Sequence, residues 1–145
     1  MIRGIGVDVS ALNRWEDAGT RDKLLRYAFC PDEIAYVTAR GKGAAQSAAG
    51  LFCAKEAFVK ALGTGLRGLA MRDIVIGHTP AGQPFYRLEG PLFEAMAAAG
   101  ANRADLSITH DGGMAAAFCV LSFEEENNAP LPVREGNARN RKGGL

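Results

Sequence analysis

Two charged side chains in the middle of this 145-residue chain are spaced for phosphate chemistry. Glu56 and Lys60 are four residues apart, so on a helix they lie one turn apart on the same face. The turn Gly63-Thr64-Gly65 follows directly, and glycines let a backbone approach a phosphate closely. The plain alternative is a surface ion pair between Glu56 and Lys60, which contributes little to stability.

A second acid, Asp8, lies in the apolar segment from Ile2 to Val9, which we expect to be a strand. On a strand, Gly4, Gly6 and Asp8 share one face, and the glycines leave room for something to approach the acid. An aspartate in an apolar strand is costly unless it is paired or ligates a cation. Asp8 therefore either belongs to a cation site, or it pairs with an arginine or caps the next turn.

Together with His110, these residues fit a magnesium–phosphate site. Mg²⁺ usually takes one or two protein carboxylates, here Asp8 and Glu56, and phosphate oxygens and waters complete its octahedron. Lys55 or Lys60 could neutralise charge on a departing phosphate. Sequence spacing does not show that Asp8 and Glu56 meet, and His110 has a purely structural alternative. The residues alone therefore support a phosphoryl-type transferase only as a hypothesis.

A long helix without proline is predicted from Gln46 to Leu62, because good helix formers fill it and Gly63 stops it. Its apolar face includes the stem of Lys55. Ser10 is expected to cap a helix from Ala11 to Ala18. The other expected elements are a helix from Pro31 to about Arg40, a hairpin of Asp73–Gly77 and Phe85–Leu88, a helix opened by Gly90-Pro91, and strands at Ala104–His110 and Met114–Phe123.

Composition places the chain among ordinary globular proteins, with 48% hydrophobic residues and a net charge of +1. This balance argues against a generic nucleic-acid binder, and no stretch has transmembrane length or the form of a signal peptide. The three widely spaced cysteines form neither a Cys-x-x-Cys pair nor a zinc pattern, so we expect reduced, mostly buried thiols in a cytoplasmic protein. One domain is predicted over 1–123, followed by a polar, disordered tail over 124–145.

Basic residues form two local groups. Arg14, Arg21 and Arg26, with Lys23, could form a patch for an acidic partner or simply a solvated face. Lys42 lies in a short Gly/Lys loop, which is weak evidence for a phosphate contact.

Three blocks of sequence occur in a recognisable order and spacing: Gly4 to Val9 with Arg14 following, Ala54 to Gly65, and Leu106 to Asp111 with Ala115 to Ala117 after it. With these blocks the chain resembles the holo-acyl-carrier-protein synthases, the small bacterial class of 4′-phosphopantetheinyl transferases. The resemblance spans Met1 to Phe123. It implies an α+β fold, in which an antiparallel sheet packs against a long central helix.

The resemblance also implies a reaction. A serine of an apo acyl carrier protein attacks the β-phosphate of coenzyme A, the phosphopantetheine arm moves to the serine, and 3′,5′-ADP leaves. The acids matching Asp8 and Glu56 hold Mg²⁺, and the lysine matching Lys60 contacts the phosphates. Arg14 lies on the helix that docks the carrier, with Arg21 and Arg26 as weaker candidates. Members are typically homotrimers with sites between subunits. The implied coenzyme contacts are Lys42, Lys55, Lys60, Gly63, Thr64, Gly65, Thr109 and His110.

Two positions depart from the family pattern. Leu51 stands where an arginine often precedes the Phe-x-Ala-Lys-Glu run, and Gln83 stands where lysine is common. One coenzyme phosphate contact is then lost or supplied by Arg40 or Lys42. A catalytically weak carrier-binding module is the competing hypothesis. A different magnesium-dependent nucleotide enzyme is a second alternative, but the sequence has no Walker-type loop. The sequence does not distinguish carriers of fatty acid, polyketide or peptide synthesis.

Overall fold

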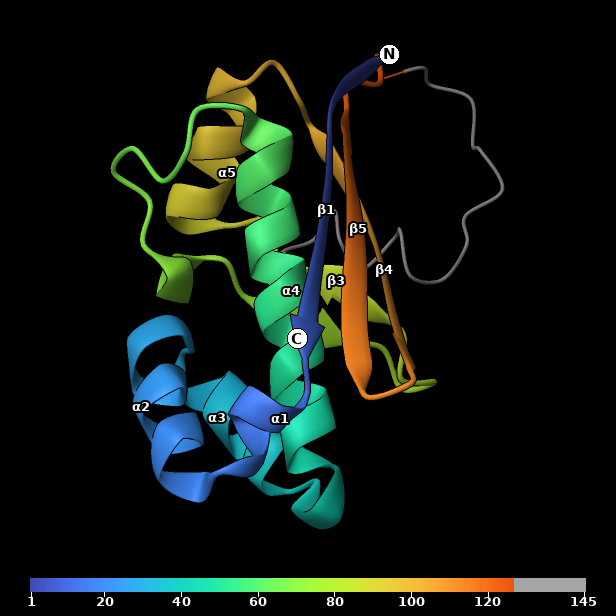
Figure 1. Ribbon diagram of the computed structural model, residues 1–145. Coiled ribbons are helices and arrows are strands. Elements are labelled where there is room, and N and C mark those ends of the chain that lie inside the picture. The colour runs from blue at the N-terminus through green and yellow to red at the C-terminus, as the bar shows by residue number, and fades with distance from the viewer. Residues whose placement is uncertain (127–145) are drawn as a thin grey trace.

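The computed structural model describes residues 1–126 and has the predicted α+β architecture (Figure 1). Its regular elements, in chain order, are β1 (Ile2–Ala11), α1 (Asn13–Glu16), α2 (Ala18–Ala28), α3 (Pro31–Thr38), the 3-10 turn η1 (Gly41–Gly43), α4 (Ala44–Leu62), the 3-10 turn η2 (Met71–Asp73), β2 (Ile76–His78), β3 (Pro84–Tyr86), α5 (Gly90–Ala98), β4 (Arg103–Asp111) and β5 (Met114–Ser122).

The main sheet is antiparallel, with strand order β1-β5-β4, and α4 lies along one of its faces (Figure 1). Alternate residues of β5 turn toward the helix, and they are the buried ones: Ala115, Ala117, Cys119 and Leu121. In the register of the sheet Asp8 lies opposite Ala117, and Ile108 lies opposite the same alanine from the other side. Asp8 therefore belongs to the row that faces α4.

The glycines of β1 make room for helix α4. A Cβ on Gly6 would lie 1.8 Å from the carbonyl oxygen of Ala57, and one on Gly4 would lie 2.0 Å from that of Ala61. Neither approach is compatible with a side chain. What approaches Asp8 along this face is thus the central helix of the same chain, and the close packing brings Asp8 beside the last turns of α4.

The central helix begins two residues before the predicted start and ends where the sequence predicted. Gly63 adopts a left-handed φ of 75° and its N–H donates to the carbonyl of Lys60. Leu51, Lys55 and Phe58 are buried, as their helical spacing predicted. The apolar face of the helix therefore includes one lysine.

The predicted helix from Ala11 to Ala18 is present only as the short α1 (Asn13–Glu16), and its predicted cap at Ser10 is wrong. β1 continues to Ala11, and the buried Ser10 hydroxyl instead accepts a hydrogen bond from the indole N–H of Trp15 at 3.2 Å. The chain then forms the short α1 and starts α2 afresh, with the Asp17 carboxylate accepting from the N–H of Thr20 at 2.8 Å. A local cap at Asp17 divides what the sequence suggested was one helix.

The predicted hairpin is present but shorter. Asp73 ends η2, where its carboxylate accepts from the N–H of Ala70 at 2.9 Å, so the strand begins only at Ile76. The turn closes with the N–H of Thr79 bound to the carbonyl of Gln83 at 2.9 Å. The predicted tail falls almost wholly on residues 127–145, which lie outside the described part of the chain. None of the helices within residues 1–126 is long and apolar enough to cross a membrane.

Candidate active site

Lys60 and Asp8 meet where the last turn of α4 crosses β1. The ammonium of Lys60 lies 3.1 Å from Asp8 Oδ1 and donates to the carbonyl of Val7 at 3.0 Å. The Asp8 side chain is 18% exposed and that of Lys60 is 54% exposed, so solvent reaches the pair. Lys60 thus pairs with an acid 52 residues away, whereas the helical spacing had suggested Glu56 as its partner.

Glu56 lies one helical turn before Lys60 and is half-buried. Burial raises the pKa of Glu56, and the negative charge of Asp8 raises it further, while Lys60 and Arg14 oppose the shift. The two acids therefore act on one another across the contact between β1 and α4. Sequence spacing did not show whether Asp8 and Glu56 lie close together, and the packing of α4 against β1 brings them together.

The chemistry of these donors suits a hard divalent cation. Two partly buried carboxylates repel each other, and a cation held between them would relieve that repulsion. Residues 1–126 contain no group of three or more His, Cys, Asp and Glu side chains arranged to hold a metal. A site with only Asp8 and Glu56 as protein ligands fits Mg²⁺, which completes its shell with phosphate oxygens and waters.

Arg14 lies next to this pair of acids. Its guanidinium is 5.6 Å from the ring centroid of Phe52 and 5.8 Å from that of Trp15, and its charge acts on Glu56. Trp15 is fully buried and packs 5.3 Å from Phe52. No sequence pattern predicted a role for these two rings at the site. They hold the exposed Arg14 beside the acids.

The other two candidate arginines differ from Arg14. Arg21 Nη1 donates to the carbonyl of Trp15 at 2.9 Å, so Arg21 secures the end of the short α1. Arg26 is exposed in the last turn of α2. Arg14 is the member of this group that lies at the acids.

His110 lies at the opposite end of α4 from the glycine turn. Its Nε2 is 3.1 Å from the carbonyl oxygen of Gln46, in the first turn of the helix, whereas Gly63 and Gly65 follow the last turn with φ of 75° and 72°. At 1.5 Å per residue the two ends are about 25 Å apart. One chain therefore does not bring His110 and the turn Gly63 to Gly65 to the same phosphate.

Thr109 and Lys42 lie on the His110 side of the molecule. Thr109 precedes His110 on β4, so its side chain points to the sheet face away from α4. Lys42 is exposed in η1, directly before α4 begins. Leu51 is 2% exposed and belongs to the core, while Gln83 is exposed in the hairpin turn.

Lys55 does not face this site, and its assignment as a coenzyme contact is wrong. The residue is fully buried. Its ammonium lies 2.7 Å from Glu33 Oε1 and donates to the carbonyls of Met71 and Ile74 at 3.0 and 2.8 Å. These contacts occupy all three of its donors, so none is free for a phosphate.

Comparison with known proteins shows the family of this chain. The model of the 4′-phosphopantetheinyl transferase superfamily matches residues 4–119. A holo-[acyl-carrier-protein] synthase of Trichlorobacter lovleyi is 44% identical over 124 residues, and one of Treponema denticola is 40% identical over 121; each alignment covers 83% of this chain and 98% of the relative. The crystal structure of the Helicobacter pylori holo-[acyl-carrier-protein] synthase in complex with coenzyme A superposes with a TM-score of 0.69 at 34% identity, covering 81% of this chain and 99% of that one. The chain belongs to the 4′-phosphopantetheinyl transferase superfamily.

Proposed function

We propose that this chain is a holo-acyl-carrier-protein synthase, which transfers the 4′-phosphopantetheine arm of coenzyme A to a serine of an apo acyl carrier protein. The reaction needs Mg²⁺ and releases 3′,5′-ADP. The observation that carries the proposal is the convergence of Asp8, Glu56 and Lys60 where β1 crosses α4. A module that only bound the carrier would have no use for two acids held against their mutual repulsion.

The proposed roles follow from the position of each side chain. Asp8 and Glu56 would hold Mg²⁺, which supplies charge neutralisation at the phosphates when it is bound. Lys60 directs its ammonium to the same place from the last turn of α4, next to the turn Gly63 to Gly65. It is placed to stabilise negative charge that develops on the departing phosphate oxygen. The N–H of Gly63 already donates to the carbonyl of Lys60, so the backbone N–H groups of Thr64 and Gly65 would bind the coenzyme.

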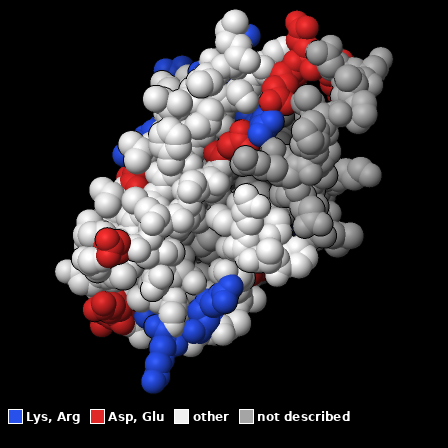
Figure 2. Space-filling model, turned by 90° about the vertical axis from the view of Figure 1, so that its right-hand side faces the viewer, with Lys and Arg blue, Asp and Glu red and all other residues white. Residues whose placement is uncertain are grey.

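A second copy of the chain would complete the coenzyme site. The face of the sheet that points away from α4 carries exposed apolar side chains, and Ile5, Val7 and Val9 on β1 are each 59–60% exposed. Phe118 and Met114 extend this surface onto β5 at 45% and 39% exposed. Figure 2 looks onto this side of the molecule and shows a broad uncharged area with charged groups toward its ends.

Apolar patches of this kind mark interaction sites. We therefore propose that the outer sheet face joins copies of the chain. Thr109 lies on this face and His110 lies at the adjoining strand end. A neighbouring copy could place them near Gly63 to Gly65, which one chain alone does not do. We propose a homotrimer, the assembly typical of the family that the chain resembles.

The proposed setting is the cytoplasm. Cys30, Cys53 and Cys119 are all free thiols, which suits a reducing compartment. We propose that the carrier serves fatty acid synthesis, and the relatives are named for an acyl carrier protein, which that synthesis uses.

The test of the reaction is the release of 3′,5′-ADP, measured by chromatography. The protein is incubated with coenzyme A, an apo acyl carrier protein and Mg²⁺, and parallel samples lack the carrier or contain EDTA. We expect 3′,5′-ADP only in the complete mixture. Binding of the carrier without release of 3′,5′-ADP would support the alternative of a carrier-binding module.

Lys60→Ala is expected to lower the turnover number on the order of 10²–10³-fold, the size seen when one preorganised charge donor is removed. The dissociation constant for coenzyme A should change much less, because a charge aimed at a developing anion acts mainly in the transition state. Initial rates at saturating substrates and calorimetry with coenzyme A measure the two effects. The matched control is Arg87→Ala, which removes the cation of the surface ion pair with Asp32. Weaker binding with unchanged turnover at saturation would refute the role in leaving-group stabilisation.

Arg14→Glu is expected to raise the Michaelis constant for the carrier strongly and to leave the constant for coenzyme A nearly unchanged. Acyl carrier proteins are acidic, and complementary charge acts mainly on encounter and orientation. Added salt should weaken use of the carrier by the wild type more than by the variant, since exposed charges are screened within about 10 Å at 0.1 M ionic strength. Arg26→Glu should have the smaller effect. Equal losses for both substrates would place Arg14 in the coenzyme pocket or in a subunit contact.

A further inference from the structure

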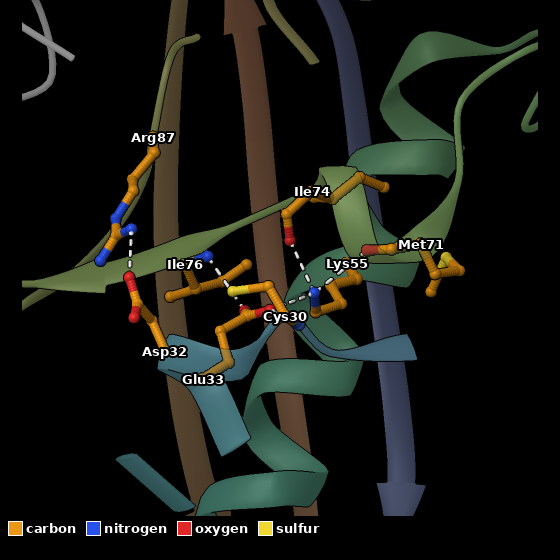
Figure 3. Close-up of polar contacts among 8 residues, drawn as sticks. All are labelled: Cys30, Asp32, Glu33, Lys55, Met71, Ile74, Ile76 and Arg87. Carbon is orange, nitrogen blue, oxygen red and sulfur yellow. Dashed lines mark hydrogen bonds and ion pairs between the residues drawn. The ribbon is translucent and has the colours of Figure 1, made fainter. Parts of the chain in front are cut away.

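The buried ion pair between Lys55 and Glu33 lies in the core beside the candidate active site, and neither side chain takes part in the proposed chemistry. Figure 3 shows the ammonium of Lys55 directed at the Glu33 carboxylate and at the carbonyl oxygens of Met71 and Ile74. The side chains of Lys55 and Glu33 are 0% and 1% exposed. The ammonium also lies 4.9 Å from the ring centroid of Phe29. Water therefore does not reach the pair.

The pair joins segments that are far apart in sequence. Glu33 Oε1 also accepts from the N–H of Cys30, and Glu33 Oε2 accepts from the N–H of Ile76, both at 3.1 Å (Figure 3). Through these two side chains α4 is bound to the start of α3, to η2 and to β2. The partners on η2 and β2 are backbone groups, so what the pair fixes is the path of the main chain.

The fixed main chain is the continuation of the glycine turn. After α4 the chain passes through Gly63, Gly65 and Gly68, which all have positive φ, and glycine leaves a backbone unusually free. Farther along this segment, the ammonium of Lys55 donates to the carbonyls of Met71 and Ile74. The segment 63–74 is thus held by α4 at its first residue and by Lys55 toward its end.

We propose that Lys55 and Glu33 are positioning residues for coenzyme A, which fix the segment 63–76 so that the turn Gly63 to Gly65 is preorganised for the phosphates. The inference rests on the proposed function of that turn. Lys55 does not touch the coenzyme. It acts through the backbone that follows the turn, so the loss of this support weakens the binding of coenzyme A.

A purely structural ion pair would behave differently. Replacing both partners of a buried pair by apolar residues of similar volume often leaves a fold equally stable, whereas removing one partner leaves a buried charge. The double variant Glu33→Met/Lys55→Met removes both charges and keeps the volume. It also removes every hydrogen bond from these two side chains to Met71, Ile74 and Ile76. The variant therefore tests whether the segment needs these hydrogen bonds while the fold as a whole stays stable.

The experiment measures hydrogen exchange by mass spectrometry and calorimetric binding of coenzyme A for the wild type and the double variant. We expect faster exchange at residues 63–76 and at the N–H of Cys30, which loses its Glu33 acceptor, with α4 and the main sheet unchanged. The dissociation constant for coenzyme A should rise about tenfold or more, while the Michaelis constant for the carrier stays within about twofold of the wild type. Glu33→Gln, which keeps the volume and one acceptor, should show the same pattern more weakly and serves if the double variant does not fold.

The matched control is Asp32→Asn, which removes the neighbouring surface ion pair between Asp32 and Arg87, at 3.2 Å. It should change neither exchange nor binding. Uniformly faster exchange, or unchanged coenzyme affinity in a folded variant, would overturn the positioning role and leave the pair as a stabilising contact. Absence of coenzyme A binding by the wild type would instead overturn the proposed function, and this inference with it.

Discussion

Glu56→Gln and Asp8→Asn are each expected to abolish phosphopantetheine transfer while the protein stays folded. Each variant keeps the volume of the side chain and removes one of the two carboxylates at the crossing of β1 and α4. Each variant would lose one of the two residues that would hold the cation, and with it the neutralisation of phosphate charge, at a cost on the order of 10²–10³-fold or more in turnover. Formation of the holo carrier at saturating Mg²⁺ and coenzyme A measures this loss.

Thermal unfolding provides the check on the fold. Burial and the negative charge of Asp8 both raise the pKa of Glu56, and removing either acid relieves the repulsion between them, so neither variant should lower the unfolding midpoint substantially. Glu94→Gln, which changes an exposed acid of α5 in the same way, is the matched control and should retain wild-type turnover. Near-normal turnover in either site variant would refute the assignment of Asp8 and Glu56 as the metal ligands.

Val7→Glu is expected to dissociate the assembly and to abolish transfer with it. Val7 is 59% exposed in the single chain and lies opposite Phe118 in the middle of the outer sheet face. An uncompensated charge buried between copies costs several kcal/mol, which lowers the association constant by more than about a hundredfold. Size-exclusion chromatography with light scattering and the initial rate of transfer measure both effects in one sample.

The matched control for Val7→Glu is Phe93→Glu. Phe93 is also an exposed apolar residue, at 43%, but it belongs to α5 and not to the sheet. This control should leave assembly and turnover unchanged. A fully active monomer, formed by the wild type or by Val7→Glu, would contradict the proposal that a second copy completes the site.

The long helix and the strands follow from local rules, which explains why the sequence predicts them well. Residues with high helix propensity fill α4, and the left-handed Gly63 ends it as expected. The alternation in β1 correctly separates Gly4, Gly6 and Asp8 from the outward apolar residues. The same pattern did not reveal what occupies the space beside the glycines, because that depends on which element packs there.

Lys55 shows where local rules fail. Its helical spacing correctly predicted a buried stem, but not whether the ammonium would reach solvent or an interior partner. That partner is Glu33, 22 residues earlier in the chain, and no local pattern connects the two. The predicted helix cap at Ser10 was wrong for a related reason. Its hydroxyl accepts a tertiary hydrogen bond from Trp15 and does not cap a helix.

The central claim is that this chain moves the phosphopantetheine arm to a carrier serine, and intact-mass spectrometry of the carrier tests it most directly. An apo acyl carrier protein is incubated with the protein, coenzyme A and Mg²⁺, beside a carrier whose acceptor serine is replaced by alanine. We expect the first carrier to gain the mass of one phosphopantetheine arm and the second to gain nothing. An unchanged mass of the first carrier, while the Helicobacter pylori relative modifies the same preparation, would contradict the central claim.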